Sequence, residues 1–248
     1  MPLICRNCGL GLQGGDDAAV FVCLNCGTAH EVLEKGLVAF SPLTAAITTE
    51  LAVAGVTHYL AVWRMAVTVT AAADSAWERI RKATAPGPAY LYVPAFSLMR
   101  AVMQRLGVSL TEVQPALELD RGLLGSGDRR PTLTEVGAGG GAGGAGRAGG
   151  GAGDNRSGGD GALGAAVAPG PDFGTYSPVV VGRQDARTLG HFVYLAVESH
   201  EAREVRSVDY RLETLGEELL FIPAVWDPRY IHESNWRLLL REFDGLVA

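Results

Sequence analysis

Cys5-Arg-Asn-Cys8-Gly9 stands close to the N-terminus, and the same pattern returns as Cys23-Leu-Asn-Cys26-Gly27. The chain has no other cysteine. Two C-x-x-C pairs separated by a short segment supply four thiolates, the tetrahedral set of soft ligands that a structural zinc ion prefers. A glycine after each pair lets the backbone turn sharply around the ion. The spacing therefore predicts one structural Zn²⁺ bound by Cys5, Cys8, Cys23 and Cys26, in a segment too short to be stabilised by a hydrophobic core alone.

Residues 3–35 resemble the zinc-ribbon family, in which two C-x-x-C-G knuckles on β-hairpins hold one ion. Arg6 and Leu24 stand where family members often carry proline. Zinc ribbons occur in nucleic-acid enzymes, in transcription and replication factors and in protein-assembly modules. The resemblance thus implies a metal-binding β module and leaves its biological role open.

Two other uses of the four cysteines compete with zinc. They are a pair of disulfides and a redox centre of the thioredoxin type. Met1-Pro2-Leu3 has neither the charged region nor the apolar stretch of a secretory signal, and a redox motif needs no second copy, so zinc in a reducing cytoplasm is expected. His30 is an alternative fourth ligand, but four thiolates already complete the shell and an exposed hairpin position is expected for it.

The charge of the first 40 residues bears on the kind of partner. Arg6 and Lys35 stand against four acidic residues, and four thiolates around one Zn²⁺ add further negative charge. A surface that binds phosphate backbones concentrates lysine and arginine instead, because released counterions supply much of the affinity. Nucleic-acid binding by this segment is therefore disfavoured, and a structural or protein-docking role is expected.

The whole chain, with 248 residues and a net charge of −6, divides into four predicted parts. Residues 1–40 form the zinc ribbon, 41–130 and 173–248 form the two parts of a mixed α/β domain, and 131–172 form a Gly/Ala-rich disordered loop or linker. Residues 137–170 contain 16 glycines and no aromatic residue, so they cannot offset the entropy lost on ordering. The predicted fold class is α+β. No transmembrane segment is expected, because Glu50 interrupts the most apolar stretch.

Hydrophobic periodicity predicts the elements of the mixed domain. Alternation predicts strands over 63–70, 90–96, 208–212 and 219–226. Helical spacing predicts three helices, of which one begins after Ser75, one ends at Gly107 and one spans 189–196. Residues 215–217 are expected to form a hairpin turn, and 236–240 fit either a strand or a helix. Tyr92-Val-Pro-Ala-Phe96 and Phe221-Ile-Pro-Ala-Val225 echo each other, which reflects either an internal duplication or chance.

A locally basic stretch offers a second functional hypothesis. It comprises Arg79, Arg81, Lys82, Arg100 and Arg105, with Tyr90, Tyr92 and Phe96 between its ends. Basic groups interleaved with aromatic rings suit single-stranded nucleic acid. The competing interpretation is that two amphipathic helices show ordinary outer faces and that the aromatic residues belong to the core.

No catalytic motif accompanies these features, since the five histidines lack metal-ligand spacing and no nucleophile motif occurs. The preferred hypothesis is a non-catalytic, cytoplasmic adaptor or assembly subunit, in which a zinc ribbon with four cysteine ligands docks a protein partner. The first alternative is a nucleic-acid-associated zinc-ribbon protein that uses the basic stretch. The second is an enzyme with a pocket in the mixed domain and a purely structural zinc.

Overall fold

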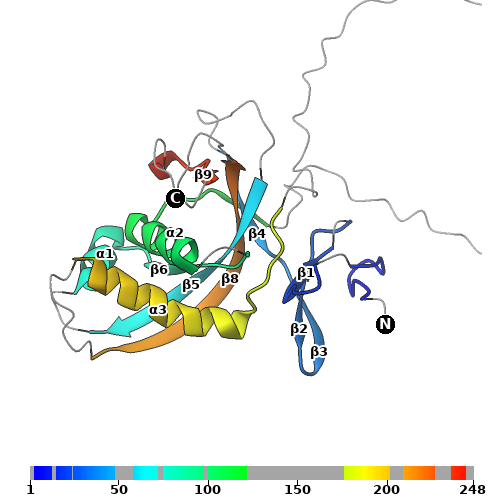
Figure 1. Ribbon diagram of the computed structural model, residues 1–248, viewed down its shortest axis with the longest axis horizontal. Helices are drawn as coiled ribbons and strands as arrows, with labels where there is room; N and C mark the ends of the chain where they lie inside the picture. Colours follow the sequence, from blue (N-terminus) through cyan, green and yellow to red (C-terminus); the bar gives the residue numbers. More distant parts are fainter. Residues whose placement is uncertain are drawn as a thin grey trace, which may run out of the picture. The chain divides into compact units, whose positions relative to one another are not determined.

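The computed structural model describes residues 3–12, 15–23, 25–47, 58–71, 75–97, 100–121, 176–201, 209–226 and 236–243 (Figure 1). All of them belong to one compact unit that contains Met1–Ser126 and Gly170–Ala248. This unit contains helices as well as sheets, which confirms the predicted α+β class. The Gly/Ala-rich segment predicted over 131–172 lies outside the described residues, so the predicted domain boundaries stay predictions.

The cysteine-containing segment forms a small antiparallel sheet in the order β1-β2-β3. Its strands are β1 (Val20–Val22), β2 (Ala29–Leu33) and β3 (Gly36–Phe40). Glu34 and Lys35 form the turn between β2 and β3, and Gly36 after them has a φ of +114°, a value that side chains rarely permit. The turn chemistry thus fixes the register of this hairpin.

The larger sheet, within the described ranges, has six strands in the order β6-β5-β8-β4-β7, with β9 also paired to β8. Its strands are β4 (Leu43–Ala45), β5 (His58–Thr70), β6 (Tyr90–Pro94), β7 (Leu119–Arg121), β8 (Arg211–Trp226) and β9 (Trp236–Leu238). The long strands β5 and β8 lie side by side in Figure 1 and pair antiparallel along all of β5. The segments before and after the glycine-rich tract therefore build one sheet together.

Three α-helices and a 3₁₀ helix accompany this sheet in the part of the chain that the structure describes. They are α1 (Ala76–Thr84), α2 (Arg100–Val113), α3 (Arg183–Glu201) and η3 (Arg241–Phe243). Ser75 caps α1, because its side chain accepts a hydrogen bond from the Glu78 amide as the sequence predicted. Among the helices that the structure describes, none combines the length and the hydrophobicity needed to cross a membrane.

The strand period of two explains why β5 is buried on both faces. Trp63 and Met65 contribute to a core that also contains Val193 and Tyr194 of α3. The β5 residues that point to the other face, such as Val62, contribute to a second core with Leu106 and Leu110 of α2. Two cores thus lie on opposite faces of the same sheet.

The predicted end of a helix at Gly107 is wrong, since α2 continues to Val113. A Cβ atom added to Gly107 would lie 2.8 Å from the Tyr92 carbonyl oxygen and 3.1 Å from a methyl group of Val193. Gly107 therefore allows α2 to approach β6 and α3 closely, a function that its sequence neighbours do not reveal.

The predicted hairpin turn at 215–217 is also wrong, because β8 runs through it without a break. Gly216 pairs with Ala66 and Thr214 pairs with Val67, so Leu215 is an extra residue in β8 and its side chain is 71% exposed. An extra residue in one strand is a β-bulge, and bulges share the glycine signal of turns.

Candidate metal centre

The two cysteine knuckles have the same backbone structure. The Gly9 amide donates a hydrogen bond to the Cys5 carbonyl oxygen at 2.9 Å, and the Gly27 amide donates to the Cys23 carbonyl oxygen at 2.8 Å. Both glycines are left-handed, with φ values of +77° and +70°. A Cβ atom on Gly9 would meet nothing within 4 Å, so backbone conformation, not space, requires glycine there.

The knuckles bring the four cysteine sulfurs together. All four lie within 4.8 Å of one another. Cys5 Sγ is 3.6 Å from Cys26 Sγ, and Cys8 Sγ is 3.4 Å from Cys23 Sγ, so each short contact joins one knuckle to the other. Zinc–sulfur bonds of about 2.3 Å place neighbouring sulfurs of a tetrahedral site about 3.8 Å apart. The arrangement fits a zinc-binding module.

The four thiols differ in burial. Cys5 and Cys23 are almost fully buried, whereas Cys8 and Cys26 are half-buried. Burial raises the pKa of Cys23 to about 12. Burial also raises the pKa of Cys26, but hydrogen bonds to the side chain and backbone of Thr28 outweigh it and bring that pKa to about 6. A bound cation would favour the thiolate at every position, which makes metal binding pH-dependent.

Two polar side chains support Cys26 from outside the cysteine set. Thr28 Oγ1 lies 3.3 Å from Cys26 Sγ, and Asn7 Nδ2 donates a hydrogen bond to the same hydroxyl oxygen at 3.2 Å. As a thiol, Cys26 donates to Thr28 Oγ1; if Cys26 is a thiolate, the Thr28 hydroxyl hydrogen can turn toward the sulfur, because Asn7 uses only a lone pair of that oxygen. Such outer partners orient ligands and tune their basicity. Neither residue belongs to the predicted ligand set, although Thr28 directly follows the second C-x-x-C-G.

His30 is not the exposed hairpin residue that we expected, because none of its surface is accessible. Its Nε2 accepts a hydrogen bond from the Arg6 amide at 3.1 Å, which ties strand β2 to the first knuckle. Burial lowers the pKa of His30 and keeps its ring neutral, as an Nε2 acceptor must be. His30 lies outside the cluster of four possible ligands, so it positions the knuckle.

The small sheet is continuous with the core of the larger one. Val20 and Val22 of β1 belong to the same buried cluster as Trp63 of β5 and Val181. The Ala19 amide donates a hydrogen bond to the Val179 carbonyl oxygen at 2.9 Å. The segment with the cysteines and strands β1 to β3, which we call the cysteine module, is therefore packed against the core of the larger sheet.

A buried carboxylate reinforces this junction. Glu31 of β2 is 3% exposed, and its Oε1 accepts a hydrogen bond from the Arg183 amide at the start of α3. Its Oε2 lies 3.6 Å from Arg183 Nε, and the guanidinium group lies over the ring of Phe40 at 5.1 Å. A carboxylate at a helix N-terminus is favourable because of the free amides there.

The residues of the predicted basic stretch belong to separate helices. Arg79, Arg81 and Lys82 lie on α1, while Arg100 and Arg105 lie on α2. Arg81 forms an ion pair with Glu78 at 2.7 Å. The helix α3 packs against both α1 and α2.

The aromatic residues of that stretch are mostly core residues. Tyr92 and Phe96 are buried, and the pKa of Tyr92 is raised to about 12 by that burial. Tyr90 is half-buried, with the Arg64 guanidinium 4.5 Å above its ring. Buried rings cannot stack on bases, so the nucleic-acid hypothesis loses two of its three aromatic groups.

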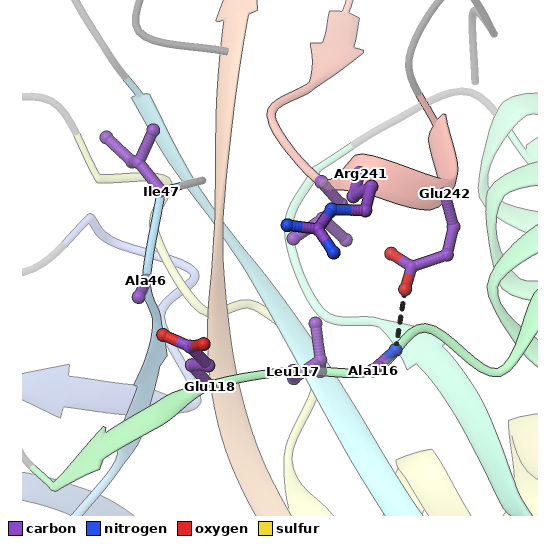
Figure 2. Close-up of a pocket in the computed structure, with 8 residues that line it drawn as sticks. Ala46, Ile47, Ala116, Leu117, Glu118, Arg241 and Glu242 are labelled. Carbon is purple, nitrogen blue, oxygen red and sulfur yellow. Dashed lines mark hydrogen bonds between the residues drawn. The ribbon is translucent and has the colours of Figure 1, made fainter. Parts of the chain in front are cut away.

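A pocket of about 440 Å³ is lined by the residues that follow β4, by those that precede β7 and by η3 (Figure 2). Glu118 borders it on one side, and Arg241 and Glu242 of η3 border it on the other. The Glu242 carboxylate accepts a hydrogen bond from the Ala116 amide at 3.0 Å, so it serves the structure. Its described lining includes neither a histidine nor a serine, threonine or cysteine.

Comparison of the chain with models of protein families, with curated proteins and with solved structures found no match. The functional assignment therefore depends on the geometry of the cysteine cluster and of its surroundings.

Proposed function

We propose that residues 1–40 form a zinc ribbon that binds one Zn²⁺ through Cys5, Cys8, Cys23 and Cys26. The convergence of the four sulfurs within 4.8 Å carries this proposal. The repeated knuckle geometry and the outer hydrogen bonds of Thr28 support it. Free thiols and zinc both suit a reducing cytoplasmic environment, which we propose as the location.

The role of this zinc is structural. Four thiolates complete a tetrahedral shell and leave no open position for a substrate or a reactive water. Zinc binding of this kind contributes apparent free energies of about 10–16 kcal/mol, which exceeds the stability of most domains. The ion stabilises a rigid module.

We further propose that this module is the docking head of a non-catalytic adaptor or assembly subunit. Large hydrophobic side chains on the described surface concentrate on it. Nine of them are exposed, and five lie in this segment: Ile4, Leu10, Val32, Leu33 and Val38. Leu33 and Val38 lie on one face of the β2–β3 hairpin, neighbouring exposed apolar side chains favour an interaction surface, and a metal-stabilised surface loses little entropy on binding.

The test is affinity purification of the tagged chain from its host, with and without nuclease, beside the double variant Cys5→Ser/Cys23→Ser. We expect protein partners that survive nuclease and disappear with the variant. Recovery that depends on nucleic acid and weakens steeply with salt would favour the basic-stretch alternative. Partners that are unchanged in the double variant, after its zinc content has been shown to fall, would refute a docking role for the module.

A further inference from the structure

The hairpin of β2 and β3 has one face that is covered only in part. The pairs Glu31↔Val38 and Leu33↔Gly36, together with strand alternation, place Glu31, Leu33 and Val38 on the same face. Glu31 is buried under Arg183, whereas Leu33 and Val38 are 45% and 43% exposed. The apolar face therefore continues from the covered junction onto the surface.

A groove of about 420 Å³ begins at Glu31 and Leu33 of this face and lies between the end of the hairpin and the start of α3. We call it the hairpin groove. Leu33, Glu34 and Lys35 line it from the hairpin, and Gly182 and Asp185 line it from the beginning of α3. Leu33 supplies an apolar wall, and Glu31, whose charge is neutralised by Arg183, also lines the groove.

The charges around the hairpin groove are mostly negative. Glu34 and Asp185 are exposed carboxylates in its lining, and Lys35 is the one cation among its described lining residues. Two more exposed carboxylates, Asp16 and Asp17, precede β1 at the same end of the small sheet. The hydrogen bond from the Val32 amide to the Ala19 carbonyl oxygen, at 3.0 Å, holds that end beside the hairpin.

We propose that the hairpin groove binds an extended segment of a partner protein in which apolar side chains alternate with lysine or arginine. Its apolar side chains would pack on Leu33 in the groove and on Val38, which lies outside the lining but on the same face of the hairpin, and its cations would meet Glu34 and Asp185. An extended segment suits the site because it can present apolar and cationic side chains side by side, to Leu33 and to the carboxylates Glu34 and Asp185 of the same lining. The proposal rests on the proposed docking function and specifies the partner's chemistry.

The direct test uses the full zinc-loaded chain and a fluorescent peptide with three Lys-Val repeats, blocked at both ends. The matched control peptide has three Glu-Val repeats. We expect saturable binding of the lysine peptide only, with a loss of at least about tenfold in the variant Glu34→Lys/Asp185→Lys. The variant Asp209→Lys, which changes an exposed carboxylate just before β8, should bind nearly as wild type.

Three outcomes would overturn the proposal. They are no binding of the lysine peptide up to millimolar concentration, equal binding of both peptides, and unchanged binding in the double charge variant. Leu33→Ser provides an independent check, because it removes apolar contact without changing charge and should weaken the lysine peptide severalfold.

Failure of this proposal can be told apart from failure of the docking function. Native partners that are still recovered with zinc-loaded Glu34→Lys/Asp185→Lys would refute the hairpin groove and leave the docking function standing. A zinc-loaded wild-type chain that recovers no protein partner would refute the docking function itself.

Discussion

Replacing Gly9 with alanine isolates the backbone requirement of the first knuckle. Gly9 has a φ of +77°, and an added Cβ atom would meet nothing within 4 Å. The amide of residue 9 can still donate to the Cys5 carbonyl oxygen after the substitution. The substitution therefore changes only the cost of the left-handed conformation, which is about 1–2 kcal/mol for a residue with a Cβ atom.

That cost should appear in zinc affinity, because the knuckle takes its shape around the metal. A loss of about 1–2 kcal/mol corresponds to roughly 5–30-fold weaker binding. Competition with a chromophoric chelator at constant pH measures it. Gly9→Asn should lose less, because asparagine tolerates this conformation better than alanine.

Gly11→Ala is the matched control. Its Cβ atom also meets nothing within 4 Å, and its φ is not left-handed. Wild-type zinc affinity in Gly9→Ala, or an equal loss in Gly11→Ala, would refute the assigned role of Gly9.

Three further predictions concern the junction and the core. Glu31→Gln removes the charged acceptor at the start of α3 and should lower the free energy of unfolding by about 1–3 kcal/mol. The control Glu213→Gln, in an exposed ion pair, should change that free energy by less than about 1 kcal/mol. Urea titration compares the two variants, and equal effects would contradict a stabilising role of Glu31 at the start of α3. Gly107→Ala should destabilise the fold by about 1–3 kcal/mol, because its Cβ atom would lie 2.8 Å from a backbone oxygen; an unchanged melting temperature would contradict this. The fragment 41–124 should be insoluble without 173–248, since β5 would lose its partner β8; a folded, soluble fragment by circular dichroism would disprove it.

The sequence predicted well those features that depend on near neighbours. The spacing of the cysteines and the glycines after them predicted the cluster, because a knuckle closes within a few consecutive residues. Alternation predicted strands β5 and β6, and the pair Ser75 and Glu78 predicted the start of α1.

Features that depend on distant contacts could not be predicted in this way. His30 is buried because its ring accepts the Arg6 amide, 24 residues away in sequence. Gly107 lies inside α2, and glycine is needed there because β6 and α3 approach the helix closely. Glu31 is one of the four acidic residues among the first 40, and no neighbour in the sequence indicates that it is buried against the start of a helix 152 residues later. A single sequence contains no local signal for such pairings.

The zinc content of the purified full chain shows whether the four cysteines bind a metal ion. Native mass spectrometry under non-denaturing conditions measures it for the wild type and for the single variants Cys5→Ser and Cys23→Ser. Our account predicts one zinc ion for each wild-type chain and well below one for each variant, because each cysteine supplies one of four ligands. A zinc content that is undiminished in both variants, or a wild-type chain that binds no zinc, would contradict it.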